Sequence, residues 1–401
     1  MPRLLNSFVV TLAFSTVGQI AFAQEAKPAA VAPVEPGAVV PLDRAKVEVK
    51  ESEKDGKKSE ETTAWYDARL VGIEGQAFSD TKALYDRLPA RAEKTVRPAV
   101  WGLSRNSAGL CVRFVTDARQ ISCRWSVTST NLGMPHMPAT GVSGVDLYAR
   151  DDAGTWRWLA AGKPTAQTTT AVLVSGLPEG KREYRLYFPL YNSVSDLQVG
   201  LPQDRSLARG PVFPEDRRKP IVFYGTSITH GASASRTGMV HTAILGRRFD
   251  RPVVNLGFSG NGKMEKEVVE FINEIDAAVF VIDCLPNMTA AEVTERTIPL
   301  VEQIRAKHPA TPILLVEDRN YSDAIFLASK RERNRTSQAA LKAEFAKLQE
   351  RKIPGLFYLS AEKLLGDDNE GTVDSSHPTD LGFFRQADAF EPVLKTILGG
   401  K

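Results

Sequence analysis

The stretch PIVFYGTSITHG, residues 220–231, decides the predicted fold. Its unbroken apolar run from Ile221 to Tyr224, opened by proline and closed by Gly225, is typical of a buried central strand in a parallel sheet. Ser227 follows two residues after that glycine, at the carboxyl end of the strand, where open α/β sheets bind their ligands. A serine in this position also suits a helix N-cap, so the stretch alone does not assign a function.

Downstream of Asp216, short apolar runs alternate with longer helical patterns. Strands are predicted at residues 221–224, 253–256, 278–282, 313–316 and 356–359, and helices at 239–249, 265–274, 290–307, 330–352 and from Thr379 onward. Because each strand is followed by a helix, we expect parallel strands with right-handed crossovers. The prediction for residues 217–401 is an α/β domain with a five-stranded, parallel, doubly wound sheet of the flavodoxin-like type.

Residues 63–212 show a different pattern, of short strands separated by turns rich in Gly, Pro, Asp and Asn. Candidate strands cover residues 110–114, 120–127, 144–150, 156–160, 170–174 and 183–189. Several of them alternate polar and apolar residues, and no convincing amphipathic helix interrupts them. We therefore expect an all-β sandwich before the α/β domain. Its aromatic residues either fill cores and interfaces, which we favour, or line a carbohydrate-binding face.

The N-terminus is typical of an export signal. Residues 4–20 are mostly apolar, and the AFA sequence at 21–23 offers small residues at a cleavage point, so we predict a signal peptide over residues 1–23. The alternative is an uncleaved membrane anchor, but polar residues interrupt the apolar stretch. Residues 24–62 are predicted to be a disordered linker, first rich in Pro and Ala and then dense in charge. The mature chain is expected to be periplasmic or secreted and to lack a membrane span.

Composition argues against several classes of partner. The 401-residue chain is 42% hydrophobic and 25% charged with a net charge of +3, a balance that predicts no nucleic-acid partner. No His-x-His or His-Glu-x-x-His spacing occurs, so we predict neither a metal nor another cofactor. Composition does not set the oligomeric state.

The three cysteines are Cys111, Cys123 and Cys284. A disulfide between the first two is one interpretation, since they fall on neighbouring predicted strands. Strand alternation, however, places Cys111 on the opposite face from the apolar set that includes Cys123. Because Cβ vectors that point apart cannot be bridged, we favour three structural thiols.

Polar and glycine-rich sequences follow four strands of the predicted parallel sheet. Ser227 follows the first strand, GFSGNG (257–262) the second, DCLPN (283–287) the third and DSSHP (374–378) comes after the fifth. Parallel strands place all their carboxyl ends at one edge, so we expect these residues to converge. A serine, a base with an orienting carboxylate, and N–H donors for an oxyanion are what acyl transfer requires.

Each of these residues also has a simpler interpretation. Asp374 and His377 could form only a local turn hydrogen bond, Asn287 could cap the helix that begins near Thr289, and Gly260 could be a turn residue. Four such coincidences at one sheet edge are less expected than a single site.

These four stretches resemble the four sequence blocks of the SGNH/GDSL hydrolase superfamily. The resemblance implies that Ser227 is the nucleophile, that His377 acts as general base and then acid, and that Asp374 orients the histidine. It further implies an oxyanion hole formed by the backbone N–H groups of Ser227 and Gly260 and by the Asn287 side chain.

The resemblance covers residues 217–398 and extends to the preceding β-domain. Thr226 stands where the superfamily often has Asp, and Asn287 lies in Leu-Pro-Asn-Met instead of Gly-x-Asn-Asp. Both variants are similar to a bacterial branch whose N-terminal domain carries a Gly-x-Asp-Leu-Tyr motif, present here as GVDLY at 144–148. Alternation puts Asp146 and Tyr148 on one face. We expect them at the domain interface, the alternative being the active-site cleft.

The remaining histidines and one basic run receive no catalytic role. His136 lies in a Pro-rich loop of the β-domain, and His230 and His241 follow the serine in sequence. The run KRERNR at 330–335 is predicted to be a solvated helix start, with the holding of an acidic substrate as the alternative.

The leading functional hypothesis is an exported serine esterase that removes short acyl groups, acetyl foremost, from small-molecule or glycan esters. A lipid esterase or an acyltransferase could use the same serine, and a non-catalytic glycan-binding protein is the alternative from another class. The carbohydrate part depends on export, the accessory domain and resemblance only.

Overall fold

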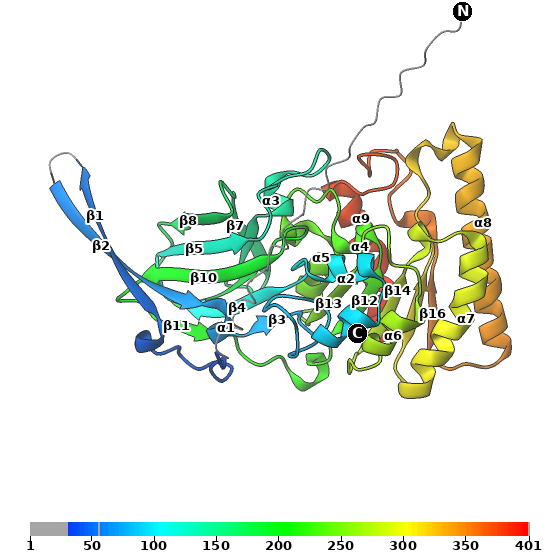
Figure 1. Ribbon diagram of the computed structural model, residues 1–401, viewed down its shortest axis with the longest axis horizontal. Coiled ribbons are helices and arrows are strands. Elements are labelled where there is room, and N and C mark those ends of the chain that lie inside the picture. Colours follow the sequence, from blue (N-terminus) through cyan, green and yellow to red (C-terminus); the bar gives the residue numbers. More distant parts are fainter. Residues whose placement is uncertain (1–30, 55–56, 400–401) are drawn as a thin grey trace, which may run out of the picture. The chain divides into compact units, whose positions relative to one another are not determined.

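The computed structural model describes residues 31–54 and 57–399 (Figure 1). The predicted signal peptide lies outside the described residues, as does the start of the predicted linker, residues 24–30. Within the described part of the chain, no helix is both long and apolar enough to cross a membrane.

The C-terminal half contains the predicted parallel sheet. Its strands are β12 (Ile221–Gly225), β13 (Val253–Gly257), β14 (Val279–Asp283), β15 (Ile313–Val316) and β16 (Leu356–Leu359). They lie in the order β13-β12-β14-β15-β16, and every pair is parallel. This is the flavodoxin-like order, with the strand that carries the PIVFYG sequence next to the centre, so the predicted fold class is confirmed.

Helices cover both faces of this sheet (Figure 1). They are α4 (Ser227–His230), α5 (His241–Arg248), α6 (Lys266–Ile272), α7 (Ala290–Lys307), α8 (Ala328–Glu350) and α9 (Asp380–Ile397). Alternate residues of β12 supply the two cores: Val222 and Tyr224 pack with residues of α6, α7 and α8, whereas Ile221 and Phe223 pack with α5 and α9. All four side chains are buried, as the continuous apolar run predicts.

The N-terminal half is a sandwich of two antiparallel sheets. One contains β1 (Lys46–Lys54), β2 (Lys57–Asp67), β10 (Val194–Pro202), β5 (Gln120–Val127) and β8 (Thr168–Ser175), in that order. The other contains β11 (Leu207–Arg209), β4 (Cys111–Thr116), β9 (Arg182–Tyr187), β6 (Val145–Arg150) and β7 (Trp156–Gly162), with β3 (Ile73–Glu74) paired to β4. Short helices α1 (Ala68–Val71) and α3 (Ala139–Val142) connect the two sheets, and α2 (Pro98–Ser104) lies between β3 and β4. Side chains from both sheets form one core, as expected of a sandwich.

The prediction that residues 24–62 form a disordered linker is wrong for the described part of this segment. Residues 46–54 and 57–67 pair as the antiparallel hairpin β1–β2. The charged sequence needs no core of its own, because β2 continues into the sandwich sheet, where Ala64 and Tyr66 are buried. Arg124 on β5 further anchors β1 through two hydrogen bonds to Glu48, at 3.0 and 2.6 Å, and this contact lowers the pKa of Glu48 to about 2.

The three cysteines are free and buried, so the favoured interpretation of structural thiols is confirmed. Cys123 lies in the sandwich core. Cys111 faces the other way and packs with Tyr148, Tyr187 and Ala243, the last of which belongs to α5. The outer face of the second sheet is therefore covered by the α/β domain.

The two domains also share a hydrophobic core. Between β3 and β4, the chain leaves the sandwich, and Val100 and Trp101 of α2 pack with Val254, Leu256 and Phe258 on and after β13. Strand β13 is the edge of the parallel sheet, so this segment protects an edge that would otherwise be exposed.

Candidate active site

Ser227 is the first residue of α4, directly after β12. Thr226 is the N-cap of this helix and accepts a hydrogen bond from the Ile228 N–H at 3.3 Å, so Ser227 does not have the capping role. The turn is tight, because a Cβ on Gly225 would lie 2.1 Å from Thr229 Oγ1. The Ser227 hydroxyl is thus not used to cap the helix. Its Oγ lies 2.8 Å from Nε2 of His377.

Asp374 contacts His377 through both the backbone and the ring. Its Oδ2 lies 2.7 Å from Nδ1 of His377, and its Oδ1 accepts the backbone N–H groups of His377 at 2.7 Å and Ser376 at 3.1 Å. Burial acts to raise the pKa of Asp374, but the hydrogen bonds from His377 and Ser376 lower it below its usual value. The local turn hydrogen bond and the contact to the ring occur together, so the two interpretations do not compete.

The turn that carries this pair has a strained residue at its centre. Ser375 has φ of 75°, a left-handed conformation that costs free energy for a non-glycine residue. Two contacts hold it: its carbonyl oxygen accepts the Ser322 N–H at 3.0 Å, and its Oγ lies 2.6 Å from Lys330 Nζ. Lys330 belongs to the basic run at the start of α8, for which the sequence predicted a solvated helix start, with the holding of an acidic substrate as the alternative.

Gly260 lies in the loop after β13 with φ of +69°, and a Cβ built there meets open space. Within the described part of the chain, neither its N–H nor that of Ser227 is given an acceptor. Both donors are therefore available to a bound group.

Asn287 ends the short 3-10 helix η5 (Leu285–Asn287) after β14. The backbone N–H groups of Asn261 and Gly262 lie 3.0 and 3.1 Å from one end of its amide. Two donors require an oxygen there, so the side-chain NH2 group occupies the opposite end. Thr289 caps the following helix, with Glu292 completing a capping box. Asn287 is thus not the cap.

Two arginines and one aspartate contact the segments that carry the site residues. Arg319 forms a buried ion pair with Asp283, at 2.7 Å for its Nη2, and Asp283 also accepts the Thr229 hydroxyl of α4 at 3.2 Å. Arg333 donates to the carbonyl oxygens of Leu285, at 3.3 Å, and Met288, on either side of Asn287. Sequence reasoning missed both arginines. The one available signal for Arg333 was its spacing of three residues from Lys330, which puts both on one helix face.

The β-domain contributes contacts that the sequence did not indicate. The Tyr191 hydroxyl donates to the carbonyl oxygen of Ser227 at 3.3 Å. The buried Arg87 donates to the carbonyl oxygens of Asn255 and Gly257, at 3.0 and 2.8 Å, where β13 ends and the glycine-rich loop begins. The ring of His136 lies 6.0 Å from that of His377, between centroids.

His230 and His241 are buried and do not contact the Ser227 hydroxyl. His230 stacks on Tyr191 and contacts the Leu190 carbonyl at 2.8 Å. His241 lies among Phe223, Phe383 and Phe390. Burial holds the pKa of both imidazoles well below the usual value. Among the described residues, no cluster of His, Cys, Asp and Glu suits a metal ion.

Asp146 and Tyr148 lie at the domain interface, as favoured, and they are buried, not exposed. Asp146 Oδ2 accepts hydrogen bonds from Arg236 at 2.7 Å and from the Gly238 N–H at 2.9 Å. Both donors belong to the segment between α4 and α5. The GVDLY motif thus fixes the chain that follows the serine helix, and burial raises the pKa of Asp146 against the opposing effect of Arg236.

The four predicted stretches therefore meet at the carboxyl edge of the sheet, with a serine, an imidazole and a carboxylate in hydrogen-bonded sequence. A doubly wound sheet with this arrangement is the fold and site of an ester-hydrolysing enzyme. Sequence comparison identifies the family: residues 218–395 match the GDSL-like lipase/acylhydrolase family, and residues 63–207 match the N-terminus of SGNH-hydrolase-type esterases named GxDLY. The chain belongs to this family of GDSL-like hydrolases.

Solved structures agree with this assignment. A protein from Bacteroides ovatus described as a GDSL-like lipase is 35% identical with a TM-score of 0.79, over 84% of this chain and 98% of that one. A salicylyl-acyltransferase from a tetracycline biosynthetic pathway is 16% identical with a TM-score of 0.63, over 92% and 96%. A family two carbohydrate esterase from Cellvibrio japonicus is 16% identical with a TM-score of 0.53, over 84% and 98%. The last two show the shared fold alone. Comparison with curated proteins gives no match.

Proposed function

We propose that this protein is an exported serine esterase that removes short acyl groups, acetyl foremost, from carbohydrate. The observation that carries the proposal is the continuous chain from Ser227 Oγ to His377 at 2.8 Å and on to Asp374 at 2.7 Å. These distances suit proton transfer from a hydroxyl to an imidazole that a carboxylate orients.

In the proposed mechanism, Nε2 of His377 takes the proton from Ser227 as Oγ attacks the ester carbonyl. The N–H groups of Ser227 and Gly260 and the NH2 group of Asn287 stabilise the negative charge that develops on the carbonyl oxygen. His377 then gives its proton to the departing alcohol oxygen, leaving the acyl group on Ser227. Water, deprotonated by the same imidazole, releases the acid and restores the serine.

Two features favour an ester substrate whose alcohol part is bulky and polar, as in a carbohydrate. The side chains of His377 and Asp374 are 27% and 45% exposed, so the site opens to solvent and can admit a polymer. The β-domain places His136 beside His377, so an accessory domain borders the site. Structures of family two carbohydrate esterases share the fold, with TM-scores of 0.53. Export is proposed from the sequence of residues 1–23 alone.

A lipid ester is the second candidate, because an apolar segment lies near the catalytic turn. Ile325 and Phe326 are 61% and 79% exposed. They follow Ser322 at the end of the 3-10 helix η6 (Ser322–Ile325), and the Ser322 N–H bonds to the turn carbonyl. An acyltransferase with the same serine is the third candidate.

The test is acetate release from acetylated polysaccharides by the purified mature protein, with Ser227→Ala as the blank. We expect release by the wild type only, and faster hydrolysis of acetyl than of octanoyl chromogenic esters. Preference for the longer chain would favour the lipid esterase, and faster acetyl transfer to sugar than to water the acyltransferase. Binding of the polysaccharide without hydrolysis of any ester would contradict all three.

A further inference from the structure

A small cavity lies between the outer face of the second sandwich sheet and the α/β domain. Its volume is about 20 Å³, and its walls include Cys111, Arg185 and Tyr187 from the sandwich and Ala243 and Arg251 from the α/β domain. Pro252 and Val253 also line it. It is therefore at the amino end of β13, whereas the serine follows the carboxyl end of β12. The cavity is thus separate from the candidate active site.

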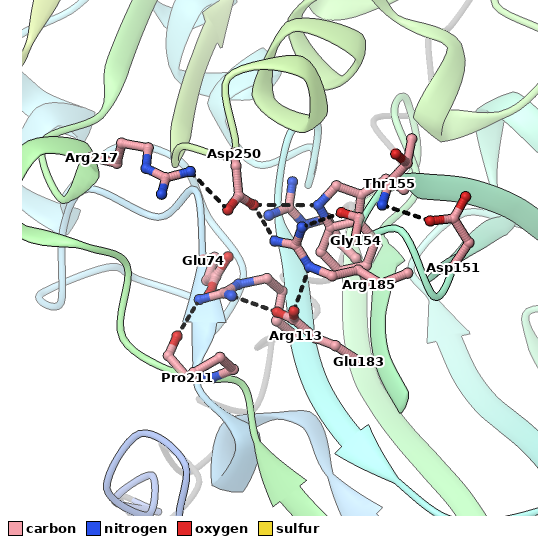
Figure 2. Close-up of polar contacts among 12 residues, drawn as sticks. Glu74, Arg113, Asp151, Gly154, Thr155, Glu183, Arg185, Pro211, Arg217 and Asp250 are labelled. Carbon is pink, nitrogen blue, oxygen red and sulfur yellow. Dashed lines mark hydrogen bonds and ion pairs between the residues drawn. The ribbon is translucent and has the colours of Figure 1, made fainter. Parts of the chain in front are cut away.

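The carboxylates near this cavity are already paired (Figure 2). Arg113 binds Glu74 at 2.7 Å and Glu183 at 2.6 Å. Arg150 binds Glu183 at 2.6 Å and also pairs with Asp250, which Arg217 contacts at 3.3 Å in addition. Each acidic group of this network is therefore paired with at least one arginine other than Arg185.

Arg185 has no such partner. Its side chain is 3% exposed, and among the described residues neither Nε nor Nη2 has a hydrogen-bond partner. Its contacts are the Tyr187 hydroxyl, 3.4 Å from Nη1, and the face of Trp156. An arginine side chain stays protonated in proteins, so this charge is buried without an anion bound to it.

Arg251, on the opposite wall, is in a similar position. It is 6% exposed, donates to the carbonyl oxygens of Lys219, at 2.8 Å, and Asp216, and has an unpartnered Nε. Cys111 adds another donor, because burial raises the pKa of its thiol to about 12 and keeps it protonated. The one carboxylate that lines the cavity, Glu74, is bound by Arg113. Among the described residues, the cavity is thus lined by two arginines whose buried N–H groups lack partners.

We propose that this cavity binds a single chloride-sized anion, held by the unpartnered N–H groups of Arg185 and Arg251, which links the two domains. The volume suits one small ion and excludes phosphate or a carboxylate ligand, since a site for one water needs roughly 10–15 Å³. Among the described residues, Glu74 and Asp250 act on Arg185, and Asp216 on Arg251, without forming an ion pair with them. An anion here gives both buried guanidinium groups a directly bound counter-charge. The alternative occupant is a water molecule, which would give neither group such a counter-charge.

Thermal unfolding of the full-length mature protein in a chloride titration tests the proposal, with sodium gluconate holding the ionic strength constant. We expect Tm to rise with chloride, by roughly 2 °C for each tenfold increase above the dissociation constant. Bromide should replace chloride, and gluconate, which is too large, should not. A Tm that does not change with chloride or bromide concentration would overturn the proposal and indicate water as the occupant of the cavity.

Arg185→Met should abolish the chloride response, whereas Arg157→Met, at an exposed arginine of β7, should keep it. An unchanged response in Arg185→Met would contradict the proposed ligand. If that variant does not fold, crystals of the wild type in bromide decide the matter. An anomalous peak in the cavity is expected, and its absence, with bromide bound elsewhere, would refute the site. None of these outcomes depends on the proposed esterase activity.

Discussion

At the scale of single residues, the important feature is that Asp374 holds both the backbone and the ring of His377. The carboxylate fixes the imidazole so that Nδ1 carries the proton and Nε2 faces Ser227. A neutral amide in its place could still accept the backbone N–H, but it could also present an NH2 group to Nδ1 and reverse the tautomer.

We therefore predict that Asp374→Asn lowers kcat for a chromogenic acetyl ester by about 10³ to 10⁴-fold and changes Tm little. Steady-state kinetics and calorimetry on the same preparation measure both. Asp368→Asn is the matched control: Asp368 is an exposed carboxylate paired with Arg385, and its loss should leave kcat unchanged. Equal activity of Asp374→Asn and the wild type would rule out the orienting role.

The sequence predicted Ser227, Gly260, Asn287, Asp374 and His377 at one edge because each follows a strand that the local pattern reveals, and parallel strands all end at the same edge. It did not indicate Arg87, Tyr191 or Arg333. Their partners are backbone carbonyl oxygens in distant segments, and a carbonyl carries no sequence signature. Such supporting residues become visible only when the tertiary structure brings the segments together.

At the scale of elements, helix α8 supports two site segments through one face. Lys330 contacts Ser375 in the turn that carries Asp374 and His377, and Arg333 binds the carbonyl oxygens around η5. A residue with positive φ persists only when neighbouring contacts hold it. The basic run is therefore a support for the site, and neither of its sequence-based interpretations describes these two residues.

We predict that Lys330→Met lowers kcat by about 10-fold and leaves KM nearly unchanged, because it loosens the turn without removing a group that contacts substrate. The neighbouring Arg331→Met is the control, since the Arg331 side chain forms a hydrogen bond to the Ala324 carbonyl, at 3.4 Å, and among the described residues none to the turn. A rise in KM with unchanged kcat would indicate that Lys330 binds substrate directly. Unchanged kcat and KM would show that the turn keeps its conformation without Lys330.

The connection from β15 to α8 also contains a buried carboxyl group. Burial raises the pKa of Asp318 to about 7, although Arg333 and Arg319 act in the opposite direction. The unfolded chain has an ordinary pKa near 4 for this group. Its stabilising contribution is therefore complete below about pH 4 and is lost as pH rises through about 7.

The wild type should therefore lose stability between pH 5 and pH 8, whereas Asp318→Asn should not. The free energy of unfolding of the variant minus that of the wild type should rise over this range by on the order of 1–3 kcal/mol. Denaturant unfolding at both pH values measures it. Asp323→Asn serves as the control: Lys330 lowers the pKa of this partly exposed carboxyl, so its effect should be the same at both pH values. A constant difference for Asp318→Asn would contradict the raised pKa.

The hairpin β1–β2 marks the limit of sequence reasoning at this scale. The dense charge of this hairpin correctly predicts that it does not form a hydrophobic core by itself. Its strands form because β2 extends a sheet whose next strand, β10, lies more than 100 residues later in the chain. Strand β10 itself escaped prediction, and so did the pairing that depends on it. Pairing between distant segments is not encoded in a local pattern.

At the scale of the whole molecule, the two domains act as one unit. They share the core formed by α2 with β13, and Asp146 binds the segment that follows the serine helix. We predict that the full chain unfolds in a single calorimetric transition and that residues 213–401 alone fail to fold cooperatively, because Val254 and Leu256 would lose their cover. Two separate transitions, or an active isolated domain, would contradict this.

The central claim is that Ser227 is the nucleophile at the edge of the parallel sheet. Labelling with a fluorophosphonate, followed by peptide mass mapping, tests it most directly, since the serine oxygen displaces fluoride and keeps the phosphonyl group. The account predicts one label per chain on Ser227, loss of ester hydrolysis in step with labelling, and no label on Ser227→Ala. A label on another residue, or full turnover by Ser227→Ala, would contradict it.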